Sequence, residues 1–295
     1  MKIISLLPSA TEIVCALGLA SDLVAVTHEC DYPAYVTEKP FITRSLLRPD
    51  LTSGEIDAAV RSQLSADAHS LYAIDRALLA TLAPDLIITQ KLCEVCAVAY
   101  DEVLDAVGSL PHQPGVLNLE PMTLSEVLAD IQRVADAAGH PDGGRQLVAT
   151  LHARIERVRE TVAHATTQPR VAFLEWIDPL FCGGHWNPEL VRLAGGIDPL
   201  GRERQPSVRI EWEQIAAFAP EVMVISCCGF SEERTRQDLP LLAALPGYAE
   251  LPCVRAGRVH IVNGSAYFSR PGPRLVDSLE MLASLLHPDL FPLIK

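Results

Sequence analysis

Eight cysteines are the residues of this 295-residue sequence best suited to bind a metal or to react. Cys93 and Cys96 form a C-x-x-C pair, a spacing that suits zinc, an iron–sulfur cluster or a redox dithiol. Because one pair does not complete a zinc site, Cys30 and Cys228 are the candidates for two further thiolates. Free cysteine is also common in protein interiors, so core packing stays open as the alternative.

Histidine and aromatic side chains form a second group of candidates. Each follows a run of residues that is predicted to be a strand, and the group comprises His28, Trp176, His185, Trp186 and Phe230. Aromatic walls with a few convergent polar groups are typical of a small-molecule site, and core packing is the alternative for the tryptophans. The sequence has no G-x-S-x-G, H-E-x-x-H or P-loop motif, so we expect a binding protein and not an enzyme.

The elements that must position these residues alternate between strand-like and helical patterns, which predicts an α/β fold with parallel sheets. The predicted strands are residues 3–7, 23–26, 86–89, 116–119, 171–176, 222–226 and 259–262. The predicted helices include residues 53–64, 71–82, 189–194, 212–218 and 273–286. We interpret Ser9-Ala-Thr-Glu12 as the capping box of a first helix that ends at Gly18.

Residues 122–166 have helical spacing without a strand signal and are interrupted near 139–144. We therefore predict three parts: an N-terminal α/β lobe over residues 1–121, a helical connector over 122–168 and a C-terminal α/β lobe over 169–295. An internal repeat supports two related lobes, because Leu82-Ala-Pro-Asp-Leu-Ile-Ile88 matches Phe218-Ala-Pro-Glu-Val-Met-Val224. Chance similarity of two common turns is the alternative. The carboxyl ends of parallel strands line the ligand crevice in open sheets, which places the cysteine segments after both strands on that side.

Charge and the first residues bear on partners and compartment. With 24 basic and 37 acidic residues the net charge is −13, and no basic run occurs, which argues against nucleic acid as a partner. The apolar residues 3–20 resemble a signal peptide only in part, since Pro8 and Glu12 interrupt them and no small-x-small cleavage site follows. We expect a cytoplasmic protein with reduced thiols. A periplasmic or membrane-associated protein with a trimmed leader is the alternative.

Several of these segments resemble the iron-siderophore and vitamin B12 periplasmic-binding family, and its cobalamin-binding members most closely. The resemblance rests on Ile3-Ile-Ser-Leu-Leu-Pro-Ser-Ala-Thr-Glu12, Asp31-Tyr-Pro33 and both copies of the repeat, and Gly257-Arg-Val-His260 and the last helix fit it. It implies two Rossmann-like lobes with parallel sheets, a long connecting helix and a ligand cleft between the lobes. It places Ser9, Tyr32, Trp176, Trp186 and Phe268 around a corrinoid, and it implies the membrane component of an ABC importer as a partner.

Three features depart from the family pattern. We find no export signal, and residues 46–70 form an insertion in the first lobe. Family members dock on the membrane component through one acidic residue of each lobe; Glu213 has this position in the second lobe, whereas Ala77 has it in the first, with Asp75 nearby. Our leading hypothesis is a non-enzymatic binding protein for cobalamin or another corrinoid, or a similar metal-containing small molecule. The alternative is a cytoplasmic metal or iron–sulfur protein that holds zinc or a cluster through Cys30, Cys93, Cys96 and Cys228. An enzyme that uses the same thiols is the third hypothesis.

Overall fold

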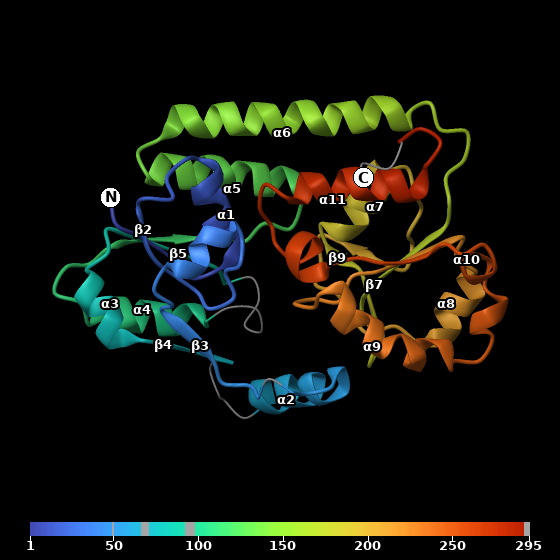
Figure 1. Ribbon diagram of the computed structural model, residues 1–295, viewed down its shortest axis with the longest axis horizontal. Helices are drawn as coiled ribbons and strands as arrows, with labels where there is room; N and C mark the ends of the chain where they lie inside the picture. The colour runs from blue at the N-terminus through green and yellow to red at the C-terminus, as the bar shows by residue number, and fades with distance from the viewer. Residues whose placement is uncertain (49, 66–70, 92–97, 292–295) are drawn as a thin grey trace. The chain divides into compact units, whose positions relative to one another are not determined.

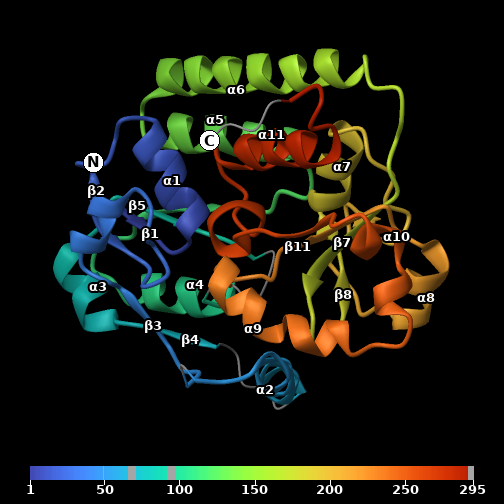
Figure 2. The same cartoon turned by 45° about the vertical axis from the view of Figure 1, so that its right-hand side comes forward.

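The computed structural model describes residues 1–48, 50–65, 71–91 and 98–291, without the side chains of residues 63–65. The chain divides into two compact units, and each is an α/β structure with a parallel sheet at its centre, as predicted (Figures 1 and 2). Unit 1 is Met1–Pro121 with Val127–Ala149, and unit 2 is Met122–Glu126 with Thr150–Lys295. None of the described helices is both long and apolar enough to cross a membrane. The predicted ligand cleft and the three-part division of the chain stay predictions.

The sheet of unit 1 has four parallel strands in the order β2-β1-β5-β6. They are β1 (Ile3–Ser5), β2 (Leu23–Val26), β5 (Leu86–Thr89) and β6 (Gly115–Asn118). Every residue of the two inner strands, β1 and β5, is buried. Continuous apolar runs of this kind form the strands of a parallel sheet that is covered on both faces, which is why the sequence identifies them.

The first helix of unit 1, α1 (Pro8–Ala16), begins differently from the prediction. Its N-cap is Leu7 and Pro8 is the first helical residue, a position that suits the fixed φ of proline. Ser9 therefore lies inside the helix, and the predicted capping box is wrong. The predicted end is confirmed, because Gly18 adopts a φ of +77° and its N–H bonds the carbonyl of Cys15.

An antiparallel pair of strands, β3 (Thr43–Ser45) and β4 (Tyr72–Ile74), extends unit 1. Residues 72–74 are therefore strand, and the prediction of one helix over 71–82 is wrong in its first part. Asp75 follows β4 directly and is the N-cap of α3 (Arg76–Leu82), because its carboxylate accepts a hydrogen bond from the Leu78 N–H. Unit 1 also contains the helices η1 (Ala34–Glu38), α2 (Ser53–Ser65) and α4 (Tyr100–Gly108).

The sheet of unit 2 has the order β12-β11-β7-β8. Its parallel strands are β7 (Val171–Trp176), β11 (Val222–Ile225) and β12 (Val259–Ile261), and β8 (Phe181–Cys182) pairs antiparallel with β7. A separate pair joins β9 (Gly184–His185) and β10 (Arg202–Glu203). Figure 1 shows α7 (Asn187–Leu193) and α11 (Leu275–Leu286) on one side of this sheet and α8 (Trp212–Phe218) and α9 (Glu232–Ala243) on the other. The remaining helices are η2 (Tyr248–Glu250), α10 (Pro252–Arg255) and η3 (Gly264–Phe268).

The two segments of the predicted repeat have the same structure. α3 and α8 each end at an alanine in the left-handed region, Ala83 at φ +47° and Ala219 at φ +51°, and each is followed by a proline and a central strand. The acidic residue of each segment then fixes the start of the neighbouring strand: Asp85 accepts from the N–H of Lys2 at 2.7 Å, and Glu221 accepts from the N–H of Arg170 at 2.9 Å. Shared bonds of this kind favour a true repeat over chance similarity.

Residues 122–166 contain two helices, α5 (Leu124–Ala137) and α6 (Pro141–Val162). The break lies at Gly139, whose φ is +71°, whereas Gly143 and Gly144 lie inside α6. Within unit 2, Arg154 of α6 bonds Glu280 of α11 at 2.9 Å and also pairs with Asp277. Bidentate contacts of this type fix the two helices against each other.

Candidate functional site

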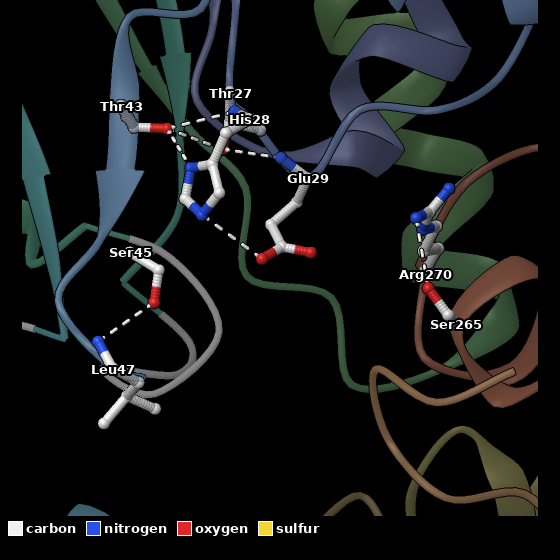
Figure 3. Close-up of polar contacts among 8 residues, drawn as sticks. All are labelled: Thr27, His28, Glu29, Thr43, Ser45, Leu47, Ser265 and Arg270. Carbon is white, nitrogen blue, oxygen red and sulfur yellow. Dashed lines mark hydrogen bonds and ion pairs between the residues drawn. The ribbon is translucent and has the colours of Figure 1, made fainter. Parts of the chain in front are cut away.

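The most constrained polar group at the strand ends of unit 1 is the imidazole of His28, which follows β2 (Figure 3). The Thr43 hydroxyl oxygen lies 2.8 Å from His28 Nδ1 and 3.2 Å from the His28 backbone nitrogen. The same hydroxyl donates to Thr27 Oγ1 at 2.8 Å. Thr27 and Thr43 are both buried, so β2 and β3 together hold the ring from its Nδ1 side.

These contacts favour one tautomer of the ring. A threonine hydroxyl has one proton to donate, and where Thr43 gives it to Thr27, Thr43 acts as an acceptor toward His28. Nδ1 then carries the proton, and a neutral ring has its lone pair on Nε2. Nε2 lies 3.2 Å from a carboxylate oxygen of Glu29, an ion pair when the ring is charged (Figure 3). When Glu29 turns away, the Nε2 lone pair can ligate a metal or accept a proton.

The surroundings of His28 combine an aromatic face with exposed polar groups. The Tyr72 ring packs against the imidazole at a centroid distance of 5.4 Å. The side chain of His28 is 20% exposed and that of Glu29 is 47% exposed, so Glu29 can turn into water and uncover Nε2. Tyr32, a predicted ligand contact, is exposed and precedes a cis peptide bond to Pro33.

In unit 2, two predicted ligand contacts form one stack at the ends of β7 and β11. The rings of Trp176 and Phe230 lie 4.7 Å apart, and the guanidinium of Arg234 lies 4.3 Å from the centroid of Phe230. Trp176 Nε1 donates to the carbonyl of Asp178 at 2.8 Å, which fixes the indole. Both aromatic side chains are only partly buried. The two rings are inclined by 41° to each other, so the pair offers partly exposed aromatic surface with a cation over Phe230, which suits a large conjugated ligand.

The Glu175 carboxylate supports this stack from behind. It accepts from the N–H of Gly184 at 2.7 Å and from Asn187 at 2.8 Å, and thus joins β7 to β9 and α7. Burial raises the pKa of Glu175, while these bonds and one from Ser207 oppose the rise. His185 lies beside it in β9 at a φ of +52°, with its ring 5.4 Å from that of Trp186, and burial lowers the pKa of His185.

Three residues predicted to contact the ligand, Ser9, Trp186 and Phe268, are buried in the structure. Phe268 is 1% exposed and packs against Phe173 at 5.3 Å, and the indole N–H of Trp186 donates to the Phe268 carbonyl at 2.9 Å. Ser9 is buried within α1. These side chains fill the interior behind the strand ends, and their contact with a ligand stays a prediction.

The cysteines give no support for a metal site in the described residues. Cys30 is buried, with its sulfur 3.0 Å from the Thr11 hydroxyl, and Cys228 is exposed. Cys93 and Cys96 lie outside the described residues. In the part of the chain that is described, no three His, Cys, Asp or Glu side chains are arranged to hold a metal ion.

Sequence reasoning missed Thr43 and Arg270. Thr43 lies in β3, 15 residues after His28, and no local pattern connects the two. Arg270 of unit 2 is buried and donates to Ser265 at 3.2 Å, next to the strand end of β12 (Figure 3). The sequence offered one signal for Arg270, which is its position in the segment that follows the predicted strand 259–262.

Comparison with known proteins decides the family. Residues 3–265 match the model of a family described as periplasmic binding protein. The chain belongs to the periplasmic binding protein family. The predicted family resemblance is therefore confirmed.

Individual members of the periplasmic binding protein family match nearly the whole chain. The vitamin B12-binding protein of Vibrio cholerae serotype O1 is 25% identical over 298 residues, which cover 97% of this chain and 88% of that protein. The vitamin B12-binding protein of Photorhabdus laumondii is 23% identical over 299 residues, with the same coverage.

Solved structures show the same fold. The periplasmic vitamin B12 binding protein of Vibrio cholerae matches with a TM-score of 0.70 at 23% identity, over 97% of this chain and 96% of that one. The apo form of a periplasmic heme-binding protein from a Roseiflexus species matches with a TM-score of 0.72 at 22% identity, over 98% of both chains. The predicted architecture of two α/β lobes is confirmed as that of periplasmic binding proteins.

Proposed function

We propose that this protein binds a metal-containing tetrapyrrole, a corrinoid such as cobalamin or a heme, and that His28 Nε2 is an axial ligand to the metal. The observation that supports the proposal is the 2.8 Å contact between His28 Nδ1 and the Thr43 hydroxyl, because an Nδ1–H ring held there would offer its Nε2 lone pair to a metal once Glu29 turns away. Imidazole is a common axial ligand of tetrapyrrole iron, and its second nitrogen is usually held by a hydrogen bond of this kind.

The strand ends of unit 2 support the same ligand class. A tetrapyrrole presents a wide conjugated or partly conjugated face, and the Trp176–Phe230 pair presents aromatic surface of matching chemistry. Arg234 adds a cation to this surface, which favours a ligand with carboxylates at its rim. The named functions of the relatives, vitamin B12 binding and heme binding, agree with this ligand class and do not distinguish its members.

We further propose that the protein delivers its ligand to an ABC importer from outside the cytoplasmic membrane, because its relatives are periplasmic substrate-binding proteins. The relatives thus favour the periplasmic alternative over the expected cytoplasmic location. Glu213 is exposed in the first turn of α8 and is available to a membrane partner. Ala77 occupies the equivalent position of α3, and Asp75, the N-cap of that helix, is the nearby acid.

Visible spectroscopy of purified protein tests the ligand. We expect titration with hemin or with aquacobalamin to shift the absorption bands as imidazole replaces water on the metal. Cyanocobalamin, whose axial cyanide exchanges slowly, separates binding of the macrocycle from ligation. The His28→Ala variant should lose the shift and keep weaker binding, and His152→Ala, which removes an exposed histidine of α6, is the matched control.

Each outcome has a defined meaning. A shift with hemin, together with no binding of aquacobalamin or cyanocobalamin, excludes the corrinoid, and a shift with aquacobalamin, together with no binding of hemin, excludes heme. If neither compound binds, the ligand class is wrong. If His28→Ala gives the same spectrum as the wild type, His28 is not the ligand.

A further inference from the structure

A cavity of about 300 Å³ lies in unit 2 along β12, which is an edge strand of the sheet. Residues 259–262 line it without a gap, so it follows the edge of the strand and reaches both faces of the sheet. α9 and α11, which lie on opposite sides of the sheet in Figure 1, supply most of the remaining wall. The wall residues used below are Arg236, Leu239, Met281 and Leu285.

The backbone of β12 contributes polar groups to this cavity. Met223 N donates to the Arg258 carbonyl and Val262 N donates to the Ile225 carbonyl, both at 3.0 Å. Alternate residues of a parallel strand bond the same neighbour, so Arg258, His260 and Val262 direct their backbone groups to β11. The backbone N–H and C=O groups of residues 259 and 261 then point away from β11, toward the cavity along the free edge of β12.

The charged and titratable side chains at the cavity are basic or neutral. His260 Nε2 is fully enclosed and has no hydrogen-bond partner among the described residues. Burial and the positive charge of Arg258 lower the pKa of His260, and Arg258 is itself bonded to the last carbonyls of α11. Arg236 lies at the rim with its side chain 60% exposed, 3.6 Å from Glu232. No acidic side chain is among the described residues that line the cavity.

We propose that this cavity is a second ligand site, separate from the strand-end residues of the proposed function, and that it binds a small monocarboxylate with a short apolar tail. The carboxylate accepts from an outward backbone N–H of β12 and from Arg236, and His260, which lines the same wall, reports the binding. The tail packs against Leu239, Met281 and Leu285. A volume at the lower end of the usual range of ligand pockets favours a ligand of few atoms. The nearby arginines disfavour an amine of the same length.

Imidazole NMR of the whole ¹⁵N-labelled protein tests this site, with hexanoate as the probe. We expect hexanoate to shift the His260 resonances saturably, with a Kd of about 1 mM as befits so small a ligand. Hexan-1-ol and hexylamine, which have the same tail, should bind at least several-fold more weakly.

Two variants locate the carboxylate and the tail. Arg236→Ala should weaken hexanoate binding about two- to fivefold, the effect of one partly exposed charge, while Arg255→Ala, an exposed arginine outside the cavity, is the matched control. Leu239→Trp should fill the cavity and abolish the shift. The proposal is overturned if hexanoate gives no saturable shift, if the alcohol binds equally well, or if Arg236→Ala and Arg255→Ala behave alike. Tetrapyrrole titrations of the same variants should match the wild type, so failure here leaves the proposed function separately testable.

Discussion

Replacing Thr43 with valine tests the hydrogen bonds on which the role of His28 rests. Valine keeps the shape of threonine but removes the hydroxyl, and with it the contacts to His28 N, His28 Nδ1 and Thr27 Oγ1 at 3.2, 2.8 and 2.8 Å. Thr43 is only 5% exposed, so water does not replace the lost acceptor. A buried polar group left without a partner costs about 1–3 kcal/mol, and two such groups are left on His28. We therefore expect the free energy of unfolding to fall by about 2–6 kcal/mol.

Two measurements separate this loss of stability from the effect on the ring. Urea denaturation gives the change in the free energy of unfolding, and the imidazole ¹⁵N spectrum shows which nitrogen of His28 carries the proton. We expect the Nδ1–H form in the wild type and a growing share of the Nε2–H form in Thr43→Val. Ligand affinity should fall about 10- to 100-fold, as is typical when a group that holds a metal ligand is removed.

Thr43→Ser is the control, because serine keeps the hydroxyl and should keep both the tautomer and most of the affinity. An Nε2–H ring in the wild-type protein would refute the reasoning outright. It would also be refuted if the valine and serine variants had the same spectrum and the same affinity.

Two further predictions concern stability in unit 2. Burial raises the pKa of the Asp198 carboxyl to about 7. Between about pH 4 and pH 7 this carboxyl is therefore ionised in the unfolded chain and protonated in the folded protein. The free energy of unfolding then falls as pH rises, by up to about 1.4 kcal/mol per pH unit. Asp198→Asn should remove this slope in urea denaturation at a series of pH values, and an unchanged slope would contradict the assignment. Gly264→Ala places a Cβ 2.2 Å from the Cys227 carbonyl oxygen and should cost more than about 2 kcal/mol, whereas Gly108→Ala meets no atom within 4 Å and should leave the Tm nearly unchanged.

The sequence was a good guide where burial alone determines the structure. The bounds of β2, β5, β7 and α8 agree with the prediction, because each strand is a continuous apolar run and α8 carries its buried residues at helical spacing. The failures occur where a distant partner decides. Residues 72–74 have helical spacing with the residues that follow, yet pairing with β3 makes them a strand. The two-residue strands β8, β9 and β10 exist only through their partners.

The same distinction explains which site residues could be found. His28 stands out because a histidine follows a buried strand, but its role depends on Thr43, which the fold brings to it from another strand. Phe268 and Trp186 stand out equally by type, yet they are buried in the interior of unit 2. Residue type and position after a strand therefore select candidates, and only packing separates a side chain that supports the site from one that contacts the ligand.

Burial disfavours metal ligation by two of the buried cysteines of unit 2, whereas an imidazole is not subject to the same constraint. A thiol must lose its proton to ligate a metal, and burial opposes that loss: it raises the pKa of Cys182, and it raises that of Cys227 to about 12. Cys30 is likewise buried, beside the Thr11 hydroxyl. His28 needs no such loss when Thr43 accepts from Nδ1–H, because Nε2 then carries the lone pair. The single imidazole bond that we propose, combined with aromatic contacts, is also easier to reverse than a set of thiolate bonds.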